Sequence, residues 1–172
     1  CRQVTVTRDT LKEAARSAHL TPWQFRVASP VPQVGHIYGL GVAGYWGSTI
    51  EIEAVVYPLG NREKGTIHFN DTAGSMARDS VTNASSVVRM ITGKNLSDYD
   101  VHVNVVGGGN IDGPSAGAAI TCAIISALTG KPLRQDIAVT GEISLSGRIK
   151  PVGGIAEKAF GAHQGGMRMA FI

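Results

Sequence analysis

The stretch that decides the fold is "DGPSAGAAITCAIISALTG", residues 112–130. Pro114 suits the first turn of a helix, and Gly130 suits the position just past a helix end. The residues between them are apolar nearly all round, which is typical of a helix at the centre of a domain. We therefore predict a buried central helix over residues 114–130, with Ser115 at its N-terminus.

The other segments mix strands and helices without regular strand–helix–strand alternation, which predicts an α+β fold of small mixed sheets with packed helices. Apolar residues at helical spacing predict helices over 8–19, capped by Asp9 or Thr10, over 71–93 and over 155–166. In the 71–93 helix the predicted apolar side holds Met76, Val81, Val87, Val88 and Ile91. Strands are expected over 36–44, 49–57, 66–70 and 100–106, as two strands within 136–154 that turn near Ser146, and over 167–172.

Composition and charge exclude several classes of protein. The chain has 172 residues, is 43% hydrophobic and carries a formal net charge of +3, with its basic residues dispersed. This pattern fits a globular core and gives no sign of nucleic-acid binding. No apolar run is long enough to span a membrane. Two cysteines, Cys1 and Cys122, make no disulfide framework, which favours a reducing compartment such as the cytoplasm.

Residues 1–34 differ in pattern from the rest of the chain. Three prolines in "LTPWQFRVASPVPQ" resist regular structure and are typical of a linker. We expect residues 1–34 to be a helix and linker from an upstream module, and residues 35–172 to form one domain. We also expect the chain to be a piece of a longer polypeptide, cut within the domain at its C-terminal end.

Ser115 is the first candidate for chemistry. Backbone N–H groups at a helix N-terminus have no partner within the helix, and they can bind an anion. A serine nucleophile there would have donors close by for the oxyanion of an acyl-transfer intermediate. The flanking glycines would keep the approach open to an extended substrate. The alternative is that Ser115 only helps to cap the helix.

A serine nucleophile needs a base. "GPSAG" satisfies the G-x-S-x-G pattern of α/β-hydrolases, and Asp136 and His163 follow Ser115 in the order of that triad. However, the loop "GGGNID" stands where that fold needs a strand running directly into the serine.

Lys158 is the better candidate for the base. Ile155, Ala159 and Ala162 share one helical face, and Lys158 is expected at its edge. An amine held against apolar surface has a lowered pKa and can act as a general base. The alternative is a lysine whose stem packs on the protein while its head reaches water.

Two long motifs in this order resemble the proteolytic domain of the Lon proteases, which are ATP-dependent serine proteases with a Ser–Lys dyad. They are "DGPSAG" and "TGEISLSGRIKPVGGIAEK" (140–158), and the resemblance runs from "VGHIYGLGV" to Ile172. It implies that Ser115 is the nucleophile and that Lys158, rather than Lys150, is the base.

The resemblance also implies supporting residues. Thr140 would hydrogen-bond the base, although it could be an ordinary strand residue. Asp112 would be the acidic neighbour of the nucleophile, or would only satisfy N–H groups at the helix start. Glu53 would match an acidic strand position near the site, or be a solvated strand residue. Two departures stand out: Ala156 replaces a lysine that many members carry, and "VVGGGNID" lacks the proline-containing loop of many Lon proteins.

The implied protein is a serine endopeptidase acting on unfolded or damaged polypeptides, within a homo-hexamer that carries an AAA+ ATPase module in cis. Its fold would be the one also seen in a domain of a small-subunit ribosomal protein. ATP and Mg²⁺ would bind the upstream module, since residues 107–115 lack the lysine of a P-loop. No metal is expected in this chain, because its histidines show no ligand spacing. The alternative is a non-catalytic scaffold domain of the same fold.

Overall fold

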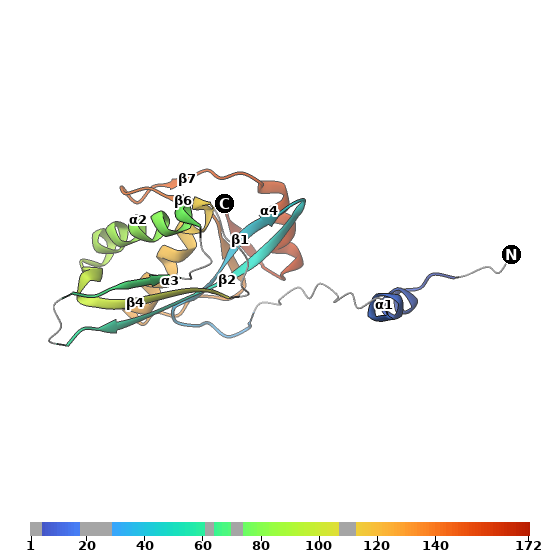
Figure 1. Ribbon diagram of the computed structural model, residues 1–172, viewed down its shortest axis with the longest axis horizontal. Helices are drawn as coiled ribbons and strands as arrows, with labels where there is room; N and C mark the ends of the chain where they lie inside the picture. The colour runs from blue at the N-terminus through green and yellow to red at the C-terminus, as the bar shows by residue number, and fades with distance from the viewer. Residues whose placement is uncertain (1–4, 18–28, 61–63, 70–73, 107–112) are drawn as a thin grey trace.

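A six-stranded mixed sheet in the order β3-β4-β2-β1-β5-β8 forms the centre of the structure (Figure 1). It comes from a computed structural model that describes residues 5–17, 29–60, 64–69, 74–106 and 113–172. The strands are β1 His36–Ala43, β2 Trp46–Pro58, β3 Ile67–Phe69, β4 Tyr99–Val106, β5 Ile137–Val139 and β8 Met169–Phe171. A separate two-stranded ribbon pairs β6 Glu142–Ile143 with β7 Ile149–Lys150.

Strand pairing is antiparallel in the middle of the sheet and parallel towards its edges. β2 lies between β1 and β4 and runs antiparallel to both. β3 pairs parallel to β4, β5 pairs parallel to β1, and β8 pairs parallel to β5. The predicted α+β class is confirmed.

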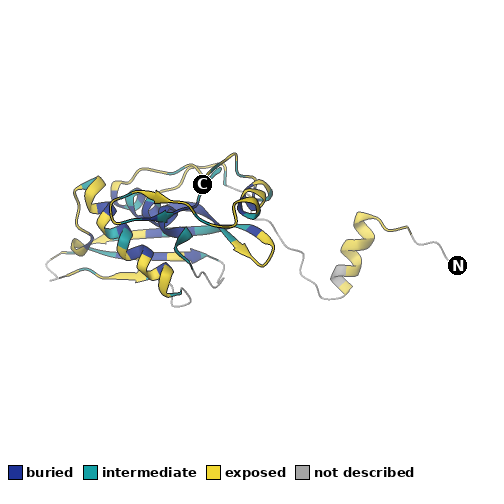
Figure 2. Cartoon of the chain, turned by 90° about the horizontal axis from the view of Figure 1, so that it is seen from above, coloured by how far each residue is buried: buried dark blue, intermediate teal, exposed yellow. Residues whose placement is uncertain are grey.

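The helices cover the two faces of the sheet unequally. α2 (Ser75–Thr92) and α3 (Gly117–Thr129) pack with β1, β2 and β4 around the main core. α4 (Ile155–Gln164) packs on the other face, where Ala162 meets Tyr38 and Leu40. Neighbouring residues of a strand point to opposite faces, so Ile37 joins the main core and Tyr38 joins the layer under α4. Figure 2 shows the buried band between these layers.

The central helix is buried as predicted, but it begins differently. Pro114–Ala116 form a 3₁₀ turn, and α3 starts at Gly117 and ends before Gly130, which has φ 66°. A left-handed residue just past a helix end is a common stop, and glycine adopts it without strain. Ser115 therefore lies in the turn that leads into the helix.

The outer helices depart in detail from the predictions. α1 (Arg8–Ser17) is capped by Thr7, whose Oγ1 accepts from Thr10 N–H at 3.2 Å, so the expected cap at Asp9 or Thr10 was wrong. The buried face of α2 is rotated by part of a turn from the predicted apolar side, so Met76 and Ile91 are exposed. Small residues, including Ala77, Ser80 and Ala84, occupy that face because α3 packs closely against it.

The prediction of two strands within residues 136–154 was incomplete, because the first of them divides. β5 stays in the main sheet, and after Thr140 and Gly141 the chain leaves it to form the ribbon of β6 and β7. Gly141 N–H donates to Ser115 O at 2.9 Å, and Gly141 O accepts from Ala118 N–H at 3.0 Å. These two hydrogen bonds thus fix the place where the chain leaves the main sheet.

Pairing with the domain begins slightly before residue 35. Gln33 and Leu133 form an isolated antiparallel bridge, with N–H···O distances of 3.0 and 2.8 Å. Residues 18–28, which include most of the predicted linker at 20–33, lie outside the described residues. Within the part that is described, no helix is long and apolar enough to cross a membrane.

Candidate active site

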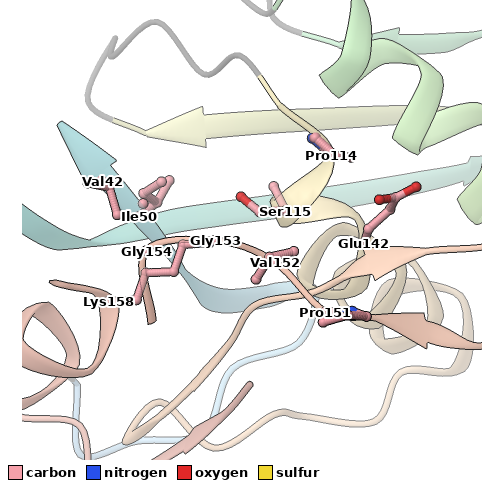
Figure 3. A pocket seen from close by; sticks show the side chains of 12 residues that line it. Val42, Ile50, Pro114, Ser115, Glu142, Pro151, Val152, Gly153, Gly154 and Lys158 are labelled. Atoms are coloured by element: carbon pink, nitrogen blue, oxygen red, sulfur yellow. The ribbon is translucent and has the colours of Figure 1, made fainter. Parts of the chain in front are cut away.

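A pocket of about 430 Å³ opens where the parallel strands β1 and β5 end. Figure 3 shows the side chains around it, with Ser115 from the 3₁₀ turn and Lys158 from α4 among them. The other lining residues come from the same 3₁₀ turn, from β1, β2 and β6, and from the loop before α4: Gly41, Val42, Ile50, Pro114, Ala116, Glu142, Pro151, Val152, Gly153 and Gly154. Segments far apart in the sequence therefore meet around one serine and one lysine.

Two hydrogen bonds to its backbone carbonyl hold Ser115 in place. Its carbonyl oxygen accepts from Gly141 N–H at 2.9 Å and from the Thr140 hydroxyl at 3.2 Å. These bonds fix the turn while the half-buried side chain lines the pocket. Asp112 and the loop before it lie outside the described residues.

Lys158 is only 4% exposed. The expectation that it lies at the edge of an apolar face with Ile155 and Ala159 was wrong, because both of those residues are exposed. The buried face of α4 is formed by Lys158, Gly161 and Ala162. Burial lowers the pKa of the Lys158 amine from its ordinary value of 10.5, because the charged form loses water.

Thr140 connects the lysine to the serine. Lys158 Nζ donates to Thr140 Oγ1 at 3.2 Å, and Thr140 Oγ1 donates to Ser115 O at 3.2 Å. A hydroxyl has one proton, so the oxygen faces the amine only as an acceptor. A neutral amine that gives one N–H to Thr140 keeps its lone pair for another partner.

Among the described residues, Lys158 Nζ makes no direct hydrogen bond to Ser115 Oγ, although both line the pocket. Catalytic hydrogen bonds often form fully only with substrate bound, so this arrangement is compatible with proton transfer after a small side-chain movement. The structure thus brings together Ser115, Lys158 and Thr140.

The triad with His163 and Asp136 does not form. Asp136 makes two hydrogen bonds to Arg134, at 2.9 and 2.8 Å, and these lower the pKa of its carboxyl. His163 is exposed on α4 and does not line the pocket around Ser115. The serine therefore has no histidine partner of the α/β-hydrolase kind.

Two further candidates lie apart from the pocket lining. Lys150 is exposed on β7. Glu53 lies on β2, where Oε2 accepts from Asn104 Nδ2 at 3.2 Å, and it points away from the core because it alternates with Ile52. Glu53 does not line the pocket around Ser115, and its expected place near the nucleophile stays a prediction.

Sequence reasoning missed Glu142 and the glycines of the loop before α4 as parts of the pocket. The "GG" at 153–154 was a usable signal, because paired glycines beside a helix start permit close approach of another backbone. Nothing in the local sequence indicates that Glu142 lines this pocket.

A domain of this fold, with a serine in the turn before a helix and a buried lysine in the same pocket, has the features of a serine hydrolase. The sequence model of the Lon protease (S16) C-terminal proteolytic domain matches residues 6–172. The chain belongs to this family, whose members are serine-type endopeptidase domains.

Curated relatives come from both bacteria and archaea. The chain is 38% identical to Lon protease 2 of Bacillus subtilis, over 97% of the chain and 32% of the relative. It is 38% identical to the Lon protease of Acinetobacter baumannii, over 99% of the chain and 21% of the relative. It is 32% identical to the archaeal Lon protease of Pyrococcus abyssi, over 97% and 18%. The chain therefore spans a third or less of the length of these relatives.

Proposed function

We propose that this domain hydrolyses peptide bonds with Ser115 as the nucleophile and Lys158 as the general base. The observation that carries the proposal is the burial of Lys158 in the pocket that Ser115 lines, with its amine oriented by Thr140. A buried amine with a lowered pKa is a suitable base near neutral pH.

The reaction follows from these roles. Neutral Lys158 takes the hydroxyl proton as Ser115 Oγ attacks the peptide carbonyl, and backbone N–H groups of the 3₁₀ turn that carries Ser115 stabilise the oxyanion. Lys158 then gives that proton to the departing amine, leaving an acyl-serine. A water molecule attacks the ester while Lys158 accepts its proton, and the proton returns to Ser115 as the acid product leaves.

The proposed setting is a longer enzyme. Because the relatives are several times longer than the chain, we propose that this domain works in cis with an AAA+ module. That module would bind ATP and Mg²⁺ and deliver unfolded or damaged polypeptides, and the whole would assemble as a homo-hexamer. A cytoplasmic location fits the free thiol of Cys122, because reducing compartments preserve free thiols.

The test is peptide and unfolded-protein hydrolysis by the full-length protein carrying Ser115→Ala or Lys158→Ala. Each change should lower the rate on the order of 10⁴-fold or more, as losses of nucleophile or base do elsewhere. Matched controls are Ser86→Ala, on the exposed side of α2, and Lys150→Ala, on β7; both should retain wild-type activity. Folding is checked by Tm.

Two outcomes would contradict the proposal. Full activity in a folded Ser115→Ala or Lys158→Ala protein would remove that residue from the mechanism. A wild-type protein with no hydrolytic activity on any unfolded polypeptide would favour the second candidate, a scaffold domain.

A further inference from the structure

The tip of the β1–β2 hairpin carries two exposed aromatic side chains. Tyr45 is 94% exposed and Trp46 is 68% exposed, and we call them the aromatic pair. The two strands stay paired up to Ala43 and Trp46, and Gly44, with φ 61°, begins the turn between them. Figure 1 shows the hairpin beside α4, and a Cβ on Gly47 would meet the backbone of that helix. The tip is therefore held in a defined position.

The aromatic pair lies at the end of a hairpin face that begins in the peptidase pocket. Ile50 lines the pocket. Side chains of a strand alternate between its two faces, so Trp46, Ser48 and Ile50 share one face. At a rise of about 3.3 Å per residue, Trp46 is about 13 Å along β2 from Ile50. An extended peptide has the same rise, so this distance corresponds to about four residues of a bound peptide.

Small residues make up the hairpin face between the pocket and the tip. On this face Gly41 stands opposite Ser48, and Ala43 stands opposite Trp46. In these two strands, no side chain larger than that of serine lies on this face between Ile50 and Trp46. An extended chain that leaves the pocket along this face therefore meets no bulky side chain of the hairpin before it reaches Trp46.

The hairpin surface is apolar and uncharged. Residues 37–50 include no charged residue, although exposed strands commonly carry charges that hinder association. Val42, which is 41% exposed, adds apolar surface at the pocket itself. Tyrosine and tryptophan supply a large contact area at a low cost in conformational entropy, and they are enriched in recognition surfaces. These properties suit a partner with exposed apolar side chains.

The size of the aromatic pair favours a peptide over a folded partner. A buried tyrosine or tryptophan side chain contributes about 150–250 Å² of contact area. A stable interface between folded proteins buries about 800 Å² on each partner. The aromatic pair is thus too small to hold a folded protein by itself, but it is large enough for one or two side chains of a peptide. Unfolded polypeptides expose the apolar side chains that folded domains bury.

We propose that the aromatic pair is a second binding site for the polypeptide being cleaved. It takes an aromatic or large aliphatic side chain about four residues away from the substrate residue beside Ile50. This proposal rests on the proposed peptidase function, and it adds a substrate class: unfolded segments with an apolar residue at that spacing. The contact is remote from the reacting bond, so it holds the substrate in the pocket and lowers KM.

The first test measures binding without cleavage, by fluorescence anisotropy on the full-length protein carrying Ser115→Ala. The probes are a labelled uncharged peptide with one phenylalanine and the same peptide with serine in its place. The phenylalanine peptide should bind more tightly, and Trp46→Ala or Tyr45→Ala should weaken its binding by about 10-fold. The matched control is Tyr57→Ala, which removes a 56% exposed aromatic side chain far along β2 and should leave both affinities unchanged.

The second test measures hydrolysis by the protein that retains Ser115. The phenylalanine is moved one position at a time along the peptide, and mass spectrometry locates the cleaved bond. KM should be lowest when the phenylalanine lies about four residues from that bond on one side. Trp46→Ala should remove this optimum.

The outcomes separate this proposal from the peptidase function. Equal affinity for the two probes, or a preference for phenylalanine that survives both tip substitutions, would overturn the proposal whether or not the protein cleaves peptides. Binding that depends on Trp46 in a protein that hydrolyses nothing would support the second site and contradict the peptidase function alone. If Trp46→Ala changes the oligomeric state in sedimentation velocity and leaves peptide binding unaltered, the tip joins copies of this chain, which would also overturn the proposal.

Discussion

The Thr140 hydroxyl controls how the Lys158 amine is presented. Its proton goes to Ser115 O, so the amine must donate to it, and no opposite charge is placed beside the lysine. A carboxylate in the same position would stabilise the ammonium and raise the pKa of the lysine. A hydroxyl orients the base while leaving the lowered pKa that burial produces.

The buried lysine should also reduce stability at neutral pH. Below its lowered pKa, Lys158 is charged in the folded and in the unfolded protein. Only the folded protein bears the cost of removing water from the charged amine. Between that pKa and 10.5, the unfolded chain binds more protons than the folded one, so stability rises with pH in this interval. Lys158→Met should therefore raise the free energy of unfolding at pH 7 and flatten the rise.

Urea unfolding of wild type and Lys158→Met at pH 7 and pH 10 measures both effects. Lys150→Met is the matched control, because Lys150 is exposed and should show neither. A Lys158→Met protein that is less stable than wild type at pH 7, with an unchanged dependence on pH, would show that the lysine is not destabilised by burial.

At the scale of elements, two glycines set the position of α4. A Cβ on Gly47 of β2 would lie 1.6 Å from Glu157 O, and a Cβ on Gly161 would lie 2.4 Å from Gly47 C. The helix therefore rests on the backbone of the strand. This close approach buries Lys158, which lies one turn before Gly161 on the same face.

Gly161→Ala should move α4 away from the sheet. In an open helix this change stabilises by up to about 1 kcal/mol, whereas overpacking costs about 1–3 kcal/mol. We expect net destabilisation and at least a tenfold loss of peptidase activity. An increase of about 1.4 kcal/mol in the activation free energy, caused by the displaced lysine, is enough for that loss. Chemical unfolding and peptide hydrolysis measure the two effects.

Gly60→Ala is the matched control, because a Cβ there meets nothing within 4 Å. It should leave stability and activity near wild type. If Gly161→Ala were more stable than wild type and fully active, the contact between α4 and β2 would not position the lysine.

The order of the helices and most strands could be predicted from periodicity, and the central helix most securely, because apolar residues surround it. The departure at Gly141 could not, since bonds to Ser115 and Ala118 divide a segment that reads as one strand. The buried face of α4 was also predicted wrongly, because small residues and a lysine form it. Gly161, a helix-disfavouring residue in mid-helix, was the available sign of a close contact.

At the scale of the whole molecule, α1 stands apart from the sheet and its helices in Figure 1. Its described side chains are exposed, including Leu11 at 60%. The pairing of Gln33 with Leu133 is the first described attachment of the chain to the sheet domain. The division of the chain between residues 34 and 35, which the prolines suggest, stays a prediction.

Deleting residues 1–17 should therefore leave the domain intact. We expect the Tm to change by less than about 2 °C, which corresponds to under about 0.7 kcal/mol for a chain of this size, and peptidase activity to be retained. Thermal unfolding and peptide hydrolysis test this. A large fall in Tm would mean that α1 packs on the domain and contributes to its core.

The most direct test of the Ser115–Lys158 assignment is the rate at which a serine-reactive fluorophosphonate labels the protein, with the modified residue located by mass spectrometry. We predict labelling at Ser115, at a rate that rises with pH as Lys158 loses its proton. The rate should fall by about 10²-fold or more in a folded Lys158→Met protein, the usual size of a general-base contribution. Labelling at another serine, or wild-type labelling of Ser115 in Lys158→Met, would contradict it.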